Sequence, residues 1–345
     1  MKNFKPLFLL TAVLITITLL VPALLVLPFS GESAGGKLGE NLSSAKPEAV
    51  PVDGKQLDSS IEVAVYRTSK KQIEKFPLER YVVGVVSAEM PAEFELEALK
   101  AQALTARTYI VKQLVTDGQL GVPKGANVTD TVIHQVFKNE EELKRIWGKD
   151  YNWKIQKVQE AVIATKGQIL TYEGKPIYTT FFSTSNGYTE NSEDYWSDSY
   201  PYLRSVASPW DVTESPKFNA QVVLTIPEFE QKLGVKVSGS NQIGEIIERT
   251  KGNRVAKVNF NGKILTGKDI REKLDLKSSD FAWVRKDDHI VINTKGYGHG
   301  VGMSQYGANG MAKEGKNYED IVKHYYQGVN ITSADQHLTT ITAKK

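Results

Sequence analysis

The chain has 345 residues, of which 41% are hydrophobic and 24% are charged, so most of it is expected to fold into packed globular structure. Its 43 basic and 40 acidic residues give a formal net charge of +3, and this near-balance argues against nucleic acid as a partner. The chain has no cysteine, which excludes disulfides, thiolate metal sites and a cysteine nucleophile.

An uncharged apolar segment lies near the N-terminus, over residues 6–29. At about 1.5 Å per residue, a helix of this length reaches roughly 36 Å and crosses a hydrocarbon layer of ~30 Å. Lys2 and Lys5 precede the segment, so the positive-inside rule keeps residues 1–5 in the cytoplasm and exports the rest. We expect a single-pass, uncleaved signal anchor in the cell membrane. A cleaved signal peptide is the alternative, although its apolar region usually spans only about 7–15 residues.

The next segment, residues 30–60, is rich in Ser, Gly and Pro and has no aromatic residue. Such a composition cannot bury enough apolar surface to offset the entropy lost on ordering. We therefore predict a flexible stalk between the membrane and the globular region.

The globular region begins with alternating and then helical patterns. Residues 61–66 alternate in polarity and predict a strand. Apolar residues at helical spacing predict helices over about 77–88 and 95–114, with Pro91 between them because proline is incompatible with a helix interior.

Further along the chain, residues 168–172 and 177–183 predict a β-hairpin, and a polar loop follows over 184–199. The sequence 289–293 predicts another strand.

Two similar segments, FNAQVVLTIPEFEQKLGVK and FNGKILTGKDIREKLDLK, follow the polar loop. In each, a strand pattern leads to a threonine, Thr225 or Thr266, with an acidic residue three positions later, Glu228 or Asp269. This spacing is typical of helix N-caps and predicts two strand–helix units that pack together.

These patterns predict an α+β fold, because strands and helices do not alternate strictly. We expect a catalytic domain formed by residues 61–216 and 292–345, with a smaller strand–helix domain over 217–291 inserted into it.

One acidic residue, Glu89, stands where an apolar helix is expected to end, directly before Met90 and Pro91 and close to Phe94. Contact with apolar groups raises the pKa of a carboxyl, which suits a general acid near neutral pH. The alternative is a solvated carboxylate at a helix end.

Two cations on the following helix, Lys100 and Arg107, are seven residues apart and share one helix face. A cationic stripe beside a carboxyl could hold an acidic or hydroxyl-rich substrate. A solvated helix face is the alternative.

The glycine-rich segment 296–302 has neither a phosphate-loop lysine nor a nucleophile elbow. Its glycines allow the backbone to approach a ligand closely. We expect His299, Ser304 and Gln305 to form the second wall of a sugar-binding cleft opposite Glu89, with loop 183–187 as its floor. The alternative is a tight structural turn.

Three motifs together resemble the stage II sporulation protein D family. They lie in residues 78–110, in Phe182-Ser-Thr-Ser-Asn-Gly187 and in residues 296–307. With the N-terminal anchor, the resemblance extends over roughly residues 60–330.

The resemblance implies a lytic transglycosylase that acts on peptidoglycan during engulfment, in the mother-cell membrane facing the forespore. Its implied partners are a sporulation amidase/endopeptidase, which first frees the glycan strands of stem peptides, and a small integral membrane protein. By resemblance, Glu89 is the catalytic acid. The residues implied to bind substrate are Lys100, Arg107, Ser183, Ser185 and Asn186.

The chain departs from several relatives in residues 130–137, where those relatives carry cysteines that appear with histidine at a zinc site. Because His134 stands without them, we expect no structural zinc and no other cofactor.

One glutamate suffices for the implied chemistry, since it can protonate the leaving oxygen and then take the proton from the 6-hydroxyl of the muramic acid. An ordinary glycoside hydrolase would need a second carboxylate, such as Asp194 or Asp198. The rival hypotheses are a non-catalytic glycan-binding amidase enhancer and, less favoured, a structural anchor of the engulfment complex.

Overall fold

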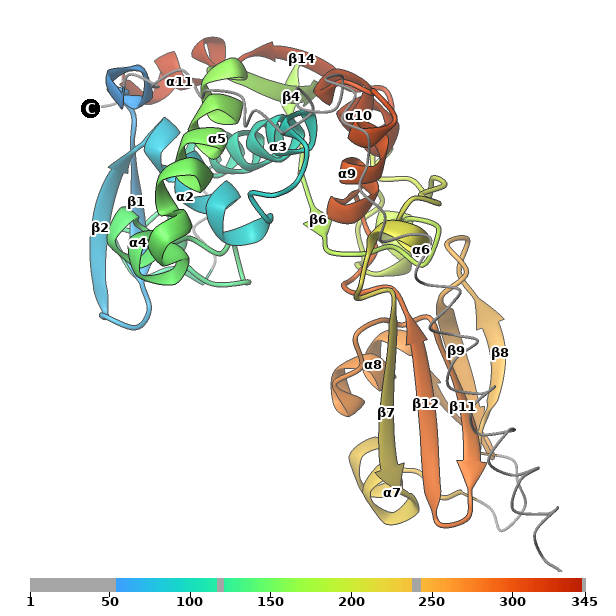
Figure 1. Cartoon of the computed structure of the whole chain (residues 1–345). Coiled ribbons are helices and arrows are strands. Elements are labelled where there is room, and N and C mark those ends of the chain that lie inside the picture. Colours follow the sequence, from blue (N-terminus) through green and yellow to red (C-terminus); the bar gives the residue numbers. More distant parts are fainter. Residues whose placement is uncertain (1–53, 117–120, 238–242, 343–345) are drawn as a thin grey trace, which may run out of the picture. The chain divides into compact units, whose positions relative to one another are not determined.

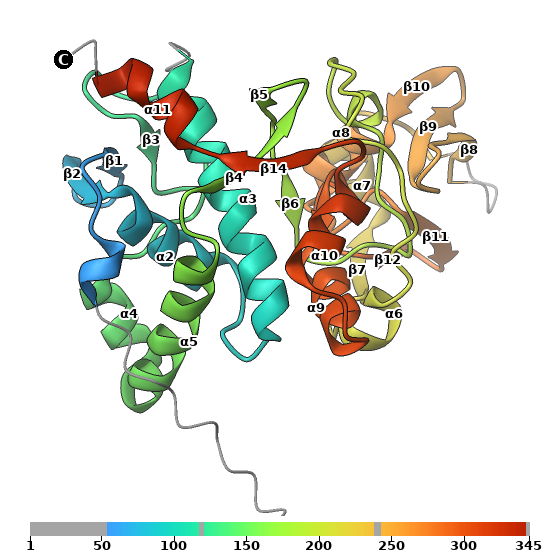
Figure 2. The same ribbon diagram turned by 90° about the horizontal axis from the view of Figure 1, so that it is seen from above.

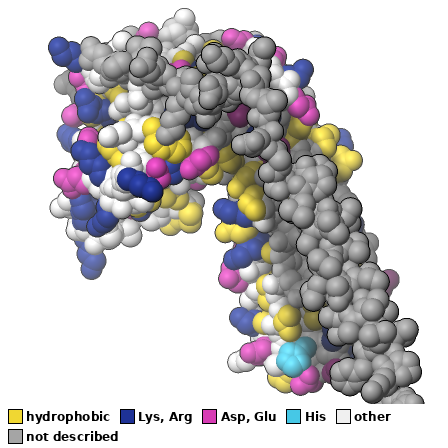
Figure 3. All heavy atoms as spheres, viewed as in Figure 1, with side chains coloured by type: hydrophobic (Ala, Val, Ile, Leu, Met, Phe, Trp, Pro, Cys, Tyr) yellow, Lys and Arg dark blue, Asp and Glu magenta, His cyan; other side chains and the backbone are white. Residues whose placement is uncertain are grey.

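The computed structural model describes residues 54–116, 121–237 and 243–342 (Figure 1). The predicted anchor, residues 6–29, and the stalk up to residue 53 lie outside these ranges. Among the described residues, no helix has the length and apolar character needed to span a membrane. On the face in Figure 3, basic and acidic side chains are interspersed, as the near-zero net charge implies.

The described part of the predicted stalk is ordered. A short 3₁₀ helix spans Gly54–Leu57, and its Leu57 side chain is buried in the core. The prediction that the stalk extends to residue 60 is therefore wrong, because the buried Leu57 side chain holds the chain against the globular core before the first strand.

The described residues between 62 and 164 form one small sheet and four α-helices. The sheet has the order β2–β1–β3, with β1 antiparallel to β2 and parallel to β3. These elements are β1 (Glu62–Arg67), β2 (Gln72–Pro77), α2 (Leu78–Glu89), α3 (Leu96–Val115), β3 (Val128–Thr129), α4 (Glu140–Trp147) and α5 (Tyr151–Ala164).

The remaining elements of this core lie in two parts of the sequence, before Asn219 and after Lys295. Strand β4 lies between β14 and β5, and β6 pairs in parallel with β13. They are β4 (Gln168–Tyr172), β5 (Lys175–Pro176), β6 (Phe181–Phe182), α6 (Asp211–Glu214), β13 (Met303–Ser304), α9 (Gln305–Lys313), α10 (Tyr318–Tyr325), β14 (Asn330–Ser333) and α11 (Asp335–Thr342).

Helix α3 is the centre of this core, and α2, α5, α9, α10, α11 and β4 all contact it (Figures 1 and 2). Ala98, Ala101, Ala103 and Ala106 are fully buried in it. Such small side chains let neighbouring elements approach the α3 backbone closely, which explains how one helix can have so many neighbours.

A second hydrophobic cluster forms between two three-stranded sheets, of order β11–β12–β7 and β10–β9–β8. Phe229, Phe260 and Trp283 contact one another in it. Its elements are β7 (Asn219–Thr225), α7 (Ile226–Leu233), β8 (Glu245–Arg249), β9 (Val255–Phe260), β10 (Lys263–Thr266), α8 (Gly267–Leu274), β11 (Phe281–Lys286) and β12 (His289–Lys295).

Mixed helices and small sheets agree with the predicted α+β class. Both threonine caps are confirmed: the Thr225 side chain accepts from the Glu228 backbone N–H, and that of Thr266 accepts from Asp269. The domain boundaries at 217 and 291 stay a prediction.

The predicted hairpin is only partly right. Strand β4 turns back into the two-residue β5, but residues 177–180 are not strand, and β6 pairs with β13 instead of β4. The sequence pattern could not reveal this partner, because the pairing joins residues more than 120 positions apart.

Candidate active site around Glu89

Glu89 is the last residue of α2, and Met90 leaves the helix in an extended conformation before Pro91. Glu89 is neither fully buried nor freely exposed. One carboxylate oxygen, Oε1, accepts a hydrogen bond of 2.8 Å from the Val136 backbone N–H. The side chain is thus held in one orientation while part of it remains accessible.

Burial raises the pKa of the Glu89 carboxyl to about 7, and the Val136 N–H opposes this shift in part by favouring the ionised form. The C-terminal end of a helix is also an unfavourable place for a negative charge. Near neutral pH the group is therefore present in both protonation states, as a residue that first gives and then takes a proton requires.

The loop that supplies the Val136 N–H is fixed to the core at two points. Phe137 stacks on Tyr81 of α2, with ring centroids 5.4 Å apart. It lies so close to Gly84 that a Cβ atom there would be 2.4 Å from the Phe137 ring. Glycine at position 84 is therefore what allows the loop to lie against α2.

The second point is Asp130, which accepts a hydrogen bond of 3.0 Å from the buried Arg67 side chain. Arg67 also pairs with Glu74 and Glu142, so one guanidinium connects three carboxylates from β2, the loop and α4. Within the loop, His134 Nδ1 bonds to Thr129, and burial lowers the His134 pKa.

Gln305 reaches Glu89 from the far end of the sequence. Its amide donates a 3.1 Å hydrogen bond to the Glu89 backbone carbonyl. Since one glutamate side chain separates that carbonyl from the carboxylate, the Gln305 amide lies within about 10 Å of it. Ser183 is close to Gln305, because the Tyr306 backbone N–H bonds to the Ser183 carbonyl at 3.1 Å. These contacts join Gln305 to the Glu89 backbone and Ser183 to the residue after Gln305, and the expected cleft wall and floor stay a prediction.

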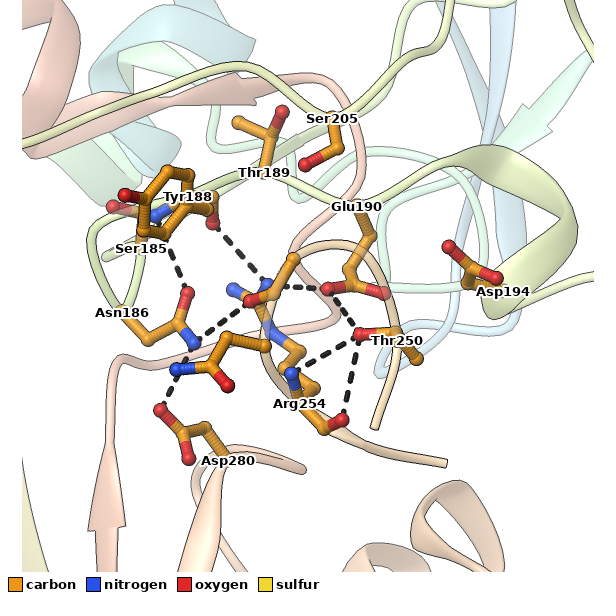
Figure 4. Close-up of polar contacts among 12 residues, drawn as sticks. Ser185, Asn186, Tyr188, Thr189, Glu190, Asp194, Ser205, Thr250, Arg254 and Asp280 are labelled. Atoms are coloured by element: carbon orange, nitrogen blue, oxygen red, sulfur yellow. Dashed lines mark hydrogen bonds and ion pairs between the residues drawn. The ribbon is translucent and has the colours of Figure 1, made fainter. Parts of the chain in front are cut away.

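The other two residues of the serine-rich loop make internal contacts. Ser185 is fully buried and donates to Asp211, which also accepts from Ser304 and Ser208. Asn186 donates to the Gly252 carbonyl and to Asp280, at 3.0 and 2.9 Å (Figure 4). Ser185 and Ser304 thus fix the loop through a buried carboxylate, and their predicted contact with substrate stays untested.

His299 has no contact with Glu89 in the part of the chain that the structure describes. Its ring contacts Phe182, Tyr195 and Trp196, with centroid distances of 5.6, 5.6 and 5.3 Å. Its Nδ1 accepts from the Val301 backbone N–H at 3.0 Å. These contacts place His299 in a separate cleft, described below.

The described residues contain no group of three or more His, Asp or Glu side chains that could hold a metal ion. No hydrogen bond or ion pair in these residues links Glu89 to another carboxylate. Asp194, a second carboxylate considered for a hydrolase, lines the cleft that contains His299.

Comparison with known proteins identifies the relatives of this chain. A family model described as Stage II sporulation protein matches residues 66–172, the segment that contains α2, Glu89 and the loop to Phe137. The chain is 51% identical to the Stage II sporulation protein D of Bacillus amyloliquefaciens, over 99% of this chain and all of that relative. It is also 51% identical to the protein of the same name from Bacillus subtilis (strain 168), over 97% and 98% of the two chains.

The chain belongs to the stage II sporulation protein D family, a family of sporulation proteins. A further relative, named amidase enhancer, from Bacillus subtilis (strain 168), is 32% identical over 72% of this chain and 40% of its own length.

The two basic positions implied by the family resemblance lie in different surroundings. Lys100 is half-buried and pairs with Glu97 at 2.6 Å, and the other Glu97 oxygen accepts from the Tyr318 backbone. Arg107 is fully buried: it forms an ion pair with Glu79 at 2.7 Å and donates to the Val162 carbonyl.

The expected cationic stripe is therefore wrong for Arg107. Spacing along α3 places both cations on one face, but α2, α5 and β4 cover that face at Arg107. The guanidinium stabilises the core through its buried partner Glu79, and it is not accessible to a substrate.

Sequence reasoning missed the Val136 N–H and the second cleft. No side-chain pattern marks a backbone donor, and only the fold brings residue 136 to residue 89. Tyr195 and Trp196 could have been noticed as adjacent aromatic residues in a polar loop.

Proposed function

We propose that this chain is a membrane-anchored lytic transglycosylase that cleaves the MurNAc–GlcNAc bond of peptidoglycan glycan strands and leaves a 1,6-anhydro-MurNAc end. The observation that carries this proposal is a single oriented glutamate, Glu89, whose carboxyl has a pKa of about 7. Membership in a sporulation family supports engulfment as its setting.

Protonated Glu89 gives its proton to the glycosidic oxygen as the bond to the anomeric carbon breaks. The resulting carboxylate, held by the Val136 N–H, then takes the proton from the 6-hydroxyl of the muramic acid as that oxygen closes the anhydro ring. The bonds balance without water, so this mechanism needs no second carboxylate.

The proposed setting is the cell membrane, with the globular part outside the cytoplasm. The proposed partners are a sporulation amidase that frees the strands of stem peptides and a small integral membrane protein.

The proposal can be tested with the full-length chain, kept in a detergent without sugar groups, and peptide-free glycan strands. Mass spectrometry should find fragments with anhydro ends. Reducing ends instead would indicate a hydrolase and contradict the proposed mechanism.

Glu89→Gln keeps the shape of the side chain but cannot exchange a proton, so cleavage should fall by at least about 100-fold. Glu93→Gln is the matched control, because Glu93 is four residues away, more than half exposed and paired with Lys154. Normal cleavage by the Glu89 variant would overturn the assignment.

A second candidate function, amidase enhancement without catalysis, is favoured by the similarity to a relative named amidase enhancer. In that case neither the native chain nor the Glu89 variant cleaves strands, while both increase the rate of an added amidase.

A further inference from the structure

A second cleft, which we call the Trp196 cleft, lies between loop 190–196 and residues 250–279. Its volume is about 270 Å³. Tyr195, Trp196, His299, Arg254 and Lys268 are among the residues that line it. In the described part of the chain, none of these residues contacts Glu89.

Aromatic rings form part of the lining of the cleft. The Trp196 and His299 rings lie 5.3 Å apart, and Tyr195 packs edge-on against Trp196 at 5.3 Å. Tyr195 and Trp196 are only half-buried, so part of their ring surface faces the cleft. Because burial lowers the pKa of His299 to about 3, its ring is neutral at physiological pH.

A buried cation, Arg254, also belongs to the lining of the cleft. Arg254 is only 2% exposed, and its Nη1 donates to Glu190 at 2.9 Å and to the Tyr188 carbonyl at 3.2 Å (Figure 4). Its Nε is buried but has no hydrogen-bond partner in the described residues. The guanidinium lies against Gly300, where a Cβ atom would be 2.5 Å from Arg254 Cζ.

Thr250 adds a hydroxyl, which donates to Glu190 at 2.9 Å (Figure 4). The Lys268 ammonium donates to the Tyr195 carbonyl at 3.3 Å and lies 4.7 Å from the Tyr195 ring.

The charges of the cleft favour a neutral ligand. Glu190 pairs with Arg254, and Glu193 pairs with Arg204. The two other charged residues of the lining, Asp194 and Lys268, have opposite signs, and Arg271 beside them donates to the Tyr195 hydroxyl at 3.2 Å. Half-exposed aromatic rings, together with hydrogen-bond donors and acceptors, suit a ligand ring that has an apolar face and polar edges.

We propose that the Trp196 cleft binds a neutral amino-sugar ring of a glycan strand at a position separate from Glu89. The cleft is smaller than the roughly 300–1,000 Å³ of sites for drug-sized ligands, which fits one or two sugar rings. This inference rests on the proposed function for the identity of the glycan. A second binding position on the same strand would raise the affinity for long strands over short ones.

The test measures binding and not cleavage, so it uses the full-length chain with Glu89→Gln, in a detergent without sugar groups. The probe is the tetrasaccharide of N-acetylglucosamine, titrated by calorimetry. Trp196→Ala removes the stacking surface, and Asp194→Asn changes a polar group at the cleft edge with almost no change in shape. We expect Trp196→Ala to weaken binding by about tenfold or more and Asp194→Asn by several-fold.

Trp147→Ala is the matched control, because Trp147 is also a half-buried tryptophan but belongs to α4 and not to the cleft. It should leave the affinity unchanged. A tetrasaccharide of galacturonic acid, which is acidic, should bind more weakly than the neutral probe.

Three results would overturn the inference: no measurable binding of the neutral probe, unchanged affinity in both cleft variants, or tighter binding of the acidic probe. Because Asp194 is exposed, its variant keeps the test decisive even if Trp196→Ala fails to fold. If the native chain leaves strands uncut but the cleft variants lose probe binding, the proposed function fails and this inference stands. If the native chain cuts strands but both variants bind the probe normally, the proposed function stands and this inference fails.

Discussion

Glu89 differs from the other acidic residues near it in its place at the end of α2 and in its hydrogen-bond partner. Glu93 and Glu97 have the cations Lys154 and Lys100 as partners, and the hydrogen bond from Lys154 helps to hold the pKa of Glu93 below its ordinary value. Glu89 instead accepts from a backbone N–H and lies among apolar groups such as Met90. This difference in partners, and not a difference in residue type, is what suits Glu89 for proton transfer.

The pH dependence of cleavage should follow the protonation of Glu89. Because the first step needs the protonated acid and the pKa is about 7, the rate should fall as the pH rises through 7, by about tenfold per unit well above it. Initial rates on peptide-free strands between pH 5 and 9 measure this. A rate that stays constant from pH 6 to 9 would contradict Glu89 as the acid.

At the scale of elements, loop 130–137 controls Glu89 through its packing on α2. Gly84→Ala places a Cβ atom 2.4 Å from the Phe137 ring and 2.6 Å from the Lys138 carbonyl, so the loop must shift. Weakening the Val136 hydrogen bond removes a contact that favours the ionised form, so the pKa of Glu89 rises.

The Gly84→Ala variant should therefore show the alkaline fall in rate displaced to higher pH. At pH 5, where Glu89 is protonated in both proteins, it should cleave strands more slowly, because the carboxyl is less firmly oriented. A merely structural effect would lower the rate equally at every pH. Overpacking typically costs about 1–3 kcal/mol and helix propensity returns about 1 kcal/mol, so the melting temperature of the variant is measured beside its rates.

Helix α3 gives a second prediction, for Arg107→Ala. Removing this cation leaves Glu79 buried without its partner and should destabilise the fold by about 3–5 kcal/mol. Lys100→Ala, on the same helix, removes only a half-buried pair and should cost about 1 kcal/mol or less. Urea unfolding of both variants compares them, and equal stabilities would show that Arg107 is not a core residue in solution.

Local patterns predicted α2, α3 and both threonine caps well, because each depends on neighbours within a few residues. They located Glu89 for the same reason, since Pro91 marks the end of its helix. They failed for Arg107 and for β6. Burial of a cation and pairing with β13 both depend on distant partners that no local spacing reveals.

At the scale of the molecule, the ion pair between Glu190 and Arg254 joins residues from the two groups of elements. Both side chains are almost fully buried, and burial raises the pKa of Glu190 above its ordinary value. Glu190→Gln or Arg254→Met alone leaves one charge without its partner and should cost about 3–5 kcal/mol.

The double variant should cost less than the sum of the two single variants, because neither charge then remains buried alone. Equilibrium unfolding of the four proteins gives the coupling energy. Additive losses would mean that the two side chains act independently.

The order in which the two hydrophobic clusters can close follows from how the chain runs through them. All buried residues of the second cluster lie between Phe229 and Ile292, so the chain can complete it soon after this segment has been synthesised. The first cluster extends from Leu57 to Leu338, and β14 must pair with β4 across about half the chain. During synthesis, α3 with its buried alanines therefore stays partly uncovered until the last residues have been made. A chain cut short before β14 would expose α3 to proteases and to aggregation.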